Sequence, residues 1–172
     1  MRKIILNVAM TLDGLIEGPN GEYDWCFNDG HDYGMTDFLN RVDAIFYGRK
    51  SYELMIKAGG ANPFTNKHTF LFSNTLPASD DYELVNGDTK SNVQAIKDSA
   101  GKDIWLFGGA SLTAAMMQEH LVDELLLAVH PIILGKGKAL FDILDNRHML
   151  KLIEFKPYPS GLVSMHYSID KN

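Results

Sequence analysis

The sequence predicts an α/β protein with a mixed, mainly parallel central sheet, helices on its faces and an antiparallel hairpin at the C-terminal end. Over the first three quarters of the chain, apolar segments of strand length alternate with segments of helical periodicity, which is typical of parallel strands joined by helices. The last quarter holds strand-like segments only, so antiparallel strands are expected at one edge. The apolar run IWLF at 104–107 is typical of a strand covered on both faces.

Each expected element follows from the spacing of its apolar residues. The expected strands are residues 3–10, 44–47, 67–72, 82–85, 104–107, 124–134, 150–156 and 162–169. The expected helices are residues 29–40, 49–58, 88–100 and 110–121. Pro131 interrupts the sixth strand and indicates an edge position or a bulge there, because proline donates no hydrogen bond to a ladder.

Composition and charge are those of an ordinary soluble protein. The 172 residues are 45% hydrophobic and 22% charged, and we expect a single domain over residues 1–172. A formal net charge of −6 disfavours a nucleic-acid partner. With one cysteine, Cys26, and neither a signal peptide nor a membrane span expected, we anticipate a cytoplasmic protein. No histidine shares a metal-ligand spacing with another histidine or with Cys26, so we expect no metal site.

Residues 11–28 form an expected loop that is long for a connection without a helix. Loops of this length in compact domains often act as lids or binding loops. This one carries three large aromatic residues, Tyr23, Trp25 and Phe27. Two interpretations stay open: the aromatic residues contact a substrate, or they pin the loop to the core.

Three strand ends offer chemistry suited to anions. Glycines at two strand-to-helix junctions allow close approach of a ligand, and the first helical N–H groups have no intrahelical acceptor. A tight turn that needs glycine for geometry alone explains the same residues equally well. The three segments are Gly48-Arg49-Lys50-Ser51, Ser73-Asn74 and Gly108-Gly109-Ala110-Ser111. If the strands are neighbours, these ends form one site for a phosphorylated dinucleotide such as NADPH. The Gly-x-Gly-x-x-Gly fingerprint of the Rossmann fold is absent.

Four short motifs carry a resemblance to a known family. The chain resembles the dihydrofolate reductase superfamily, and more closely the bacterial proteins grouped with the reductase domain of the riboflavin-biosynthesis deaminase/reductase. The motifs are MTLDG at 10–14, GRKSYE at 48–53, IWLFGGA at 104–110, and LVDEL at 121–125 with Pro131 and Leu134-Gly135 after it. The resemblance implies a three-layer α/β/α fold with NADPH along the strand ends. It also implies cofactor phosphates at residues 48–51 and 108–112, Leu112 included, with Ser73 and Asn74 near the adenosine.

The chemistry implied by the resemblance is hydride transfer from a nicotinamide to a C=N or C=O bond of a small heterocyclic or carbonyl substrate. The loop with Trp25 and Phe27 would cover the nicotinamide and contact the substrate. Asp29 and Asp32, at the start of the expected helix, are the candidate proton donors, because a carboxylate in an apolar pocket has a raised pKa. The alternative is that they cap the helix.

Two differences between this sequence and known members of the family bear on which substrate it could use. Folate enzymes of the family hold the glutamate tail with an arginine where this chain has Lys67, so folate is a doubtful substrate. Residues 12–40 contain seven acidic residues and no lysine or arginine, which disfavours a phosphorylated substrate unless Lys136 or Lys138 reaches the site. Three functions stay open: a reductase of another small substrate, the 5-amino-6-(5-phosphoribosylamino)uracil reductase of riboflavin biosynthesis, and a non-catalytic nucleotide sensor. The resemblance also implies a homodimer formed through the terminal hairpin.

Overall fold

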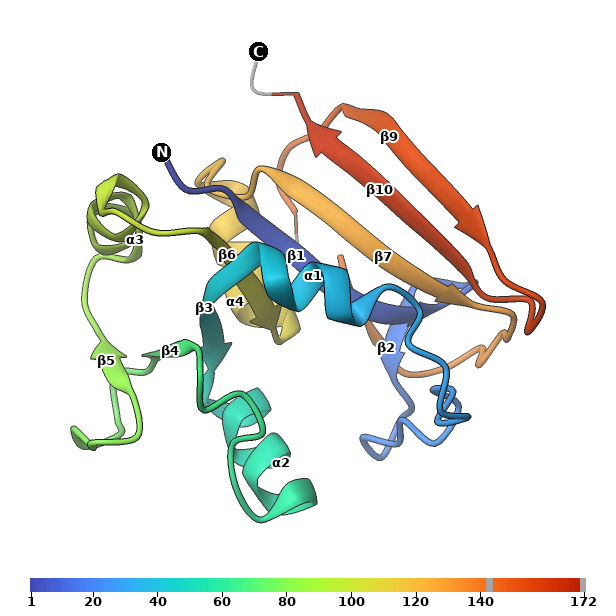
Figure 1. Cartoon of the computed structure of the whole chain (residues 1–172), viewed down its shortest axis with the longest axis horizontal. Coiled ribbons are helices and arrows are strands. Elements are labelled where there is room, and N and C mark those ends of the chain that lie inside the picture. The colour runs from blue at the N-terminus through green and yellow to red at the C-terminus, as the bar shows by residue number, and fades with distance from the viewer. Residues whose placement is uncertain (142–143, 171–172) are drawn as a thin grey trace.

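The computed structural model describes residues 1–141 and 144–170. Its main feature is an eight-stranded sheet with four helices packed on its two faces (Figure 1). The strands are β1 (Ile4–Thr11), β2 (Leu15–Glu17), β3 (Val42–Gly48), β4 (His68–Phe72), β5 (Glu83–Val85), β6 (Asp103–Gly108), β7 (Glu124–His130), β8 (Lys138–Ala139), β9 (Leu150–Pro157) and β10 (Val163–Ile169). The helices are α1 (Met35–Arg41), α2 (Arg49–Gly59), α3 (Thr89–Asp98) and α4 (Ala110–Gln118).

The sheet is mixed and mainly parallel, as the sequence predicts. Its order is β5-β4-β3-β6-β1-β7-β10-β9, and the pairings from β5 to β7 are all parallel. The pairings β7–β10 and β10–β9 are antiparallel, which confirms the terminal hairpin. A separate antiparallel pair, β2–β8, lies beside the carboxyl end of β1. Because the parallel strands point the same way, the ends of β3, β6, β1 and β7 share one edge of the sheet.

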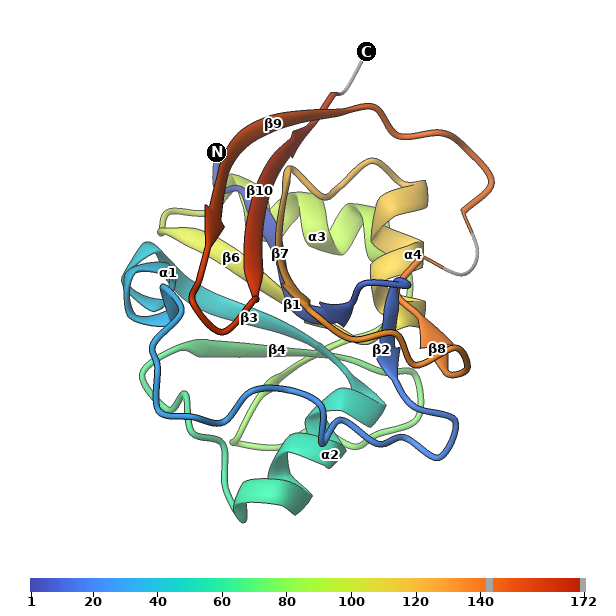
Figure 2. The ribbon, with the colours of Figure 1, turned by 90° about the vertical axis from the view of Figure 1, so that its right-hand side faces the viewer.

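Helices cover both faces of the sheet and give three layers (Figure 2). On one face, Phe38 of α1 and Met55 of α2 pack over a core that includes Ile5 and Trp105. On the other face, α3 and α4 pack over a core built from alternate residues of the same strands, such as Leu6 and Leu106. Alternation along each strand therefore supplies both cores, as expected for a buried parallel sheet.

Two predicted elements differ in their bounds. The helix expected at residues 29–40 begins only at Met35, because Gly30 and Gly34 adopt φ values of +79° and +84° that end any regular helix. The strand expected at 124–134 ends at His130, before Pro131, and it lies between β1 and β10. The expected edge position is therefore wrong: the proline ends the strand because it cannot donate to either neighbour.

Candidate active site

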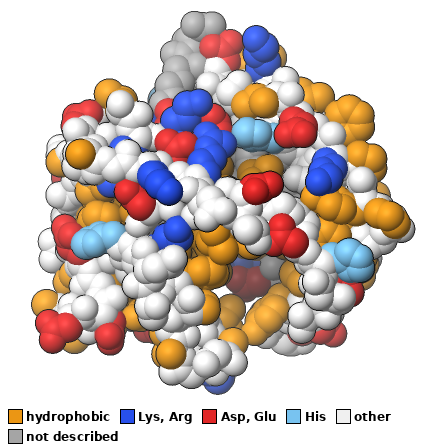
Figure 3. Space-filling view, viewed as in Figure 1, with side chains coloured by type: hydrophobic (Ala, Val, Ile, Leu, Met, Phe, Trp, Pro, Cys, Tyr) orange, Lys and Arg blue, Asp and Glu red, His pale blue; other side chains and the backbone are white. Residues whose placement is uncertain are grey.

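A large cleft lies where the parallel strands β3 and β6 end. It has a volume of about 640 Å³, and the surface is hollowed there between α2 and the loop after β2 (Figure 3). The first turns of α2 and α4 form two of its walls, and the loop after β2 forms a third. Its lining residues are Glu17, Asn20, Gly21, Gly48, Arg49, Lys50, Ser51, Leu54, Phe72, Gly109, Ala110, Ser111, Leu112, Ala115 and Lys138.

Two helix N-termini open into this cleft without side-chain caps. Gly48 precedes α2 and Gly109 precedes α4, and neither helix has a side-chain hydrogen bond to its first turn. In α3, by contrast, Asp88 accepts a hydrogen bond from the Ser91 amide. The free N–H groups of α2 and α4, with the positive ends of the helix dipoles, favour an anion between them.

The glycines are needed because the two junctions approach each other closely. A Cβ atom added at Gly48 would lie 3.3 Å from the Gly108 carbonyl oxygen, and one added at Gly109 would lie 3.0 Å from Ser51 Oγ. A larger residue at either position would occupy the space between the helices. The sequence leaves open whether these glycines allow a tight turn or the close approach of a ligand. In the structure, the same two glycines do both: they allow the junctions to lie close together, and they keep the space between the helices free.

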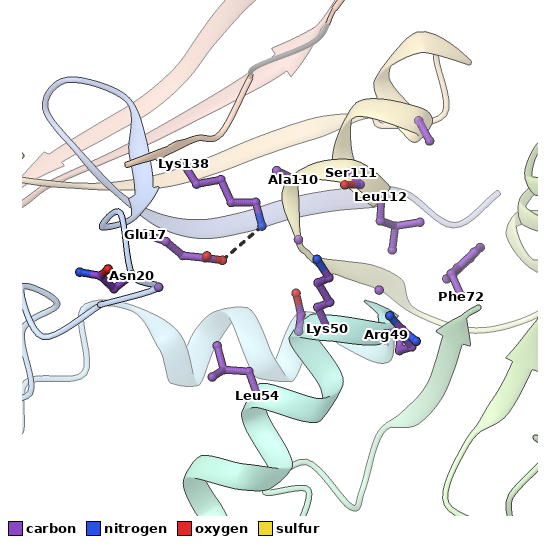
Figure 4. Close-up of a pocket in the computed structure, with 15 residues that line it drawn as sticks. Glu17, Asn20, Arg49, Lys50, Leu54, Phe72, Ala110, Ser111, Leu112 and Lys138 are labelled. Carbon is purple, nitrogen blue, oxygen red and sulfur yellow. Dashed lines mark hydrogen bonds and ion pairs between the residues drawn. The ribbon is translucent and has the colours of Figure 1, made fainter. Parts of the chain in front are cut away.

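Cations reach the cleft from two sides. Figure 4 shows the ammonium groups of Lys50 and Lys138 directed into the same space, one from α2 and one from β8. Lys138 Nζ lies 3.4 Å from Glu17 Oε1, so this ion pair links β8 to β2 across the cleft wall. The sequence indicates Lys138 only as a side chain that could reach a phosphate and does not indicate Glu17 as a cleft residue, because it is the β2–β8 pairing that brings both to the cleft.

A second cavity of about 370 Å³ continues the cleft toward β4 and β5. Arg49, Phe72 and Leu112 line both, and Ser73 and Asn74 line the second. Arg49 donates a hydrogen bond of 3.4 Å from Nη1 to Thr75 Oγ1 and has an exposed partner, Glu53, at 3.9 Å. The residues predicted for the cofactor are therefore brought together in one elongated groove, with Gly108 directly behind it.

Asp29 and Asp32 lie outside this groove and are exposed. The Tyr33 hydroxyl donates to Asp29 at 2.6 Å and lowers its pKa. Thr36 donates to Asp32 through its hydroxyl at 2.7 Å and its amide at 3.0 Å, which lowers the pKa of that carboxyl too. The expectation of a raised pKa in an apolar pocket is wrong for both residues: these carboxylates cap the turn that leads into α1.

Trp25 and Phe27 pack on His130, the last residue of β7. The Trp25 ring meets the imidazole edge-on with centroids 5.3 Å apart, and the Phe27 ring does so at 4.8 Å. His130 is only 4% exposed, and burial lowers its pKa. Between the two aromatic residues, Cys26 has a pKa raised to about 11 by burial and by Asp24, so its thiol stays protonated and unreactive. The aromatic residues thus do pin the loop, and they do so on a buried polar group.

The Lys67 side chain forms hydrogen bonds with the main chain. Its ammonium donates to the carbonyl oxygens of Leu39 and Val42 at 2.6 and 2.8 Å, where it ties the end of α1 to the start of β3.

Within residues 1–141 and 144–170, no group of three histidine, cysteine, aspartate or glutamate side chains is placed to hold a metal ion. Among the helices within residues 1–141 and 144–170, none is long and apolar enough to cross a bilayer.

The model of the RibD C-terminal domain family matches residues 2–164. The chain belongs to this family. Among its relatives is the uncharacterized protein YyaP of Bacillus subtilis (strain 168), which is 43% identical over 178 residues that cover 96% of this chain and 94% of YyaP. The family assignment confirms the resemblance drawn from the four sequence motifs.

Solved structures show the same fold. A putative riboflavin biosynthesis protein from Shewanella sp. PV-4 superposes with a TM-score of 0.89 at 24% identity, covering 99% of this chain and all of the other. Dihydrofolate reductase from Enterococcus faecalis, solved in complex with NADP(H), superposes with a TM-score of 0.69 at 13% identity, covering 98% and 97%. The fold of this member of the RibD C-terminal domain family is therefore dihydrofolate reductase-like.

Proposed function

We propose that this protein is an NADPH-dependent reductase that transfers hydride to a C=N or C=O bond of a small substrate. The observation that carries the proposal is the convergence of Arg49, Ser73 and Gly109 on one groove at the ends of parallel strands. The family match and the E. faecalis enzyme with NADP(H) support a nicotinamide cofactor on this fold. The nicotinamide supplies the hydride, and the protein supplies binding and orientation.

The groove suits a phosphorylated dinucleotide at each of its parts. The uncapped first turns of α2 and α4, with Lys50 and Lys138, would hold the pyrophosphate. Arg49 and Ser73, at the continuation toward β5, would hold a ribose phosphate at the adenosine end. The loop after β2 borders the cleft through Asn20 and Gly21 and would shield the reacting end from water.

Titration of cofactor fluorescence tests the proposal. Wild-type protein is expected to bind NADPH at micromolar concentrations. Arg49→Gln is expected to weaken NADPH binding roughly tenfold and to leave NADH binding unchanged, because a charge-assisted hydrogen bond to the extra phosphate is lost. Lys57→Gln, in the last turn of the same helix, is the matched control. No binding of NADPH to the wild type would contradict the proposal.

We also propose that the chain forms a homodimer through β9. This edge strand is exposed along its length, including Leu152, Ile153 and Phe155 at 48%, 51% and 63%. Figure 2 shows the β9–β10 hairpin facing the viewer with no helix over it. An exposed apolar edge strand favours pairing with another chain. Sedimentation should give twice the chain mass, and Phe155→Lys should halve it, whereas Met35→Lys on α1 should not. A single-chain mass for the wild type would refute the dimer.

A further inference from the structure

One face of the central strands is incompletely covered where they approach the groove. β6, β1 and β7 lie in the middle of the sheet, and on the face of α3 and α4 Leu127 and Val129 are buried, while Val8 and Met10 pack half-buried against the core. On the face of α1 and α2, however, the carboxyl-terminal halves of these strands keep half-buried side chains. These side chains are Asn7 and Ala9 of β1, Phe107 of β6 and Ala128 of β7. These side chains form a strip along one face of three neighbouring strands.

The strip runs from the cofactor groove to His130. β6 ends at Gly108, beside the groove, and β1 separates β6 from β7. His130 ends β7 on the same face as Ala128 and pairs in register with Thr11. The loop after β2 spans the same distance, because its residue Asn20 lines the groove and its residue Trp25 contacts His130. A substrate on the strip would therefore lie between the cofactor and His130, beneath one loop.

Polar groups at the far end of the strip have no partners within the described chain. His130 Nδ1 and Trp25 Nε1 are both buried and form no hydrogen bond there. The side-chain amide of Asn7 likewise forms none with the described residues. Buried donors and acceptors are almost always bonded to protein or water, so two adjacent orphan nitrogens indicate a place where a ligand supplies the bonds.

These groups are neutral. His130 is buried between two aromatic rings, and the indole and the amide carry no charge. The surrounding segment, residues 12–40, adds seven acidic residues and no lysine or arginine. Such a site can bond the donor and acceptor atoms of an uncharged ring edge, and it repels a phosphate.

We propose that His130, together with Trp25 Nε1 and the Asn7 amide, binds the hydrogen-bonding edge of a neutral planar heterocycle and so selects unphosphorylated ring substrates. The inference rests on the proposed reductase function, because it places the substrate beside the cofactor groove. It names His130 as the residue that determines specificity, in addition to the loop aromatic residues. Ala9 and Ala128 have small side chains, and the Phe27 ring packs on His130 with ring centroids 4.8 Å apart.

Nuclear magnetic resonance of the indole N–H groups tests this directly. The chain has two tryptophans, and Trp105 Nε1 already donates to the Asn7 carbonyl oxygen at 3.0 Å, so its signal is an internal control. Uracil or pterin at millimolar concentration should shift the Trp25 signal downfield and leave that of Trp105 in place. Toluene, which has no polar edge, should not produce the downfield shift. Trp25→Phe assigns the signal.

Substitutions at position 130 separate hydrogen bonding from packing. His130→Leu retains bulk and should weaken binding of the shifting heterocycle at least tenfold. His130→Asn restores an amide near Nδ1 and should keep affinity within about threefold of wild type. His120→Leu, at an exposed histidine after α4, is the control and should change nothing. If Leu and Asn at position 130 behave alike, the packing of His130 and not its hydrogen bonding matters, and the inference is overturned.

The outcomes separate this inference from the reductase proposal. Binding of NADPH without any shift of the Trp25 signal by uracil or pterin overturns the inference and leaves the proposed function standing. A shift of the Trp25 signal in protein that fails to bind NADPH overturns the proposed function and retains the ring site. Uridine 5′-monophosphate that binds as tightly as uracil overturns the selection against phosphate.

Discussion

Replacing Glu124 with glutamine should destabilise the fold by an amount that depends on pH. Glu124 begins β7, and its carboxylate is 4% exposed. Lys3 Nζ lies 2.6 Å from Oε1, while Arg41 Nη2 and His166 Nε2 lie 2.7 and 2.8 Å from Oε2. One buried carboxylate therefore ties the start of β1, the end of α1 and the strand β10 together.

The pKa of Glu124 gives the size of the expected loss in the free energy of unfolding. Burial alone would raise this pKa, but hydrogen bonds from Lys3, His166 and Arg41 outweigh it and lower the pKa from 4.5 to about 2. A difference of this size between the folded and unfolded chain corresponds to about 3 kcal/mol of stability. The pKa is depressed in the folded state, so the contribution is complete above pH 4.5. It declines as the pH falls toward 2, because the unfolded chain then binds a proton that the folded chain does not.

Urea unfolding of the wild type and of Glu124→Gln at several pH values measures this contribution to stability. The free energies of unfolding should differ by about 3 kcal/mol at pH 7 and by about 1.5 kcal/mol at pH 3. Glu119→Gln makes the same chemical change in an exposed ion pair, 3.0 Å from Lys90, and should cost less than about 1 kcal/mol at either pH. A difference for Glu124→Gln that stays the same from pH 7 to pH 3 would refute the reasoning.

Two further predictions concern the site. Lys138→Gln should weaken NADPH binding roughly tenfold in a fluorescence titration, because a cation directed into the cleft is lost, whereas Lys136→Gln, which does not line the cleft, should bind as the wild type does. Equal affinity of both variants would place the pyrophosphate away from Lys138. Asp32→Ala should cost about 1 kcal/mol in urea unfolding and leave NADPH affinity unchanged, because Asp32 caps the turn before α1. A loss of NADPH affinity in this variant would contradict the structural role.

The cofactor half of the groove could be predicted from the sequence because main-chain geometry determines it. Gly48 and Gly109 each stand between an apolar strand and a helix, and local patterns of this kind indicate a free helix N-terminus wherever the chain folds. The order of the strands then decides whether such ends meet, and the family motifs supplied that order. The sequence could not decide whether Lys136 or Lys138 reaches the site, because the approach of Lys138 depends on the short β2–β8 pairing, and strands of two or three residues show no periodicity.

The surroundings of Asp29 and Asp32 could not be predicted from the sequence, for a related reason. Asp29 and Asp32 were placed at the start of a helix, but Gly30 and Gly34 delay α1 to Met35 and leave both carboxylates in an exposed turn. Residue type and spacing cannot separate a capping carboxylate from a buried acid, because burial is a property of the tertiary packing.

The two halves of the groove therefore differ in what they demand of the sequence. In the proposed function, the cofactor end would use main-chain N–H groups and long cationic side chains, which tolerate wide variation in the residues around them. The proposed substrate end would depend on particular side chains, the aromatic residues of one loop and His130 at the end of β7. Substitution there changes which ring edge is bonded without disturbing the helix N-termini. A single fold could then keep one cofactor while its substrate changes, and under the proposal made here His130 is a position where substitution would change the substrate.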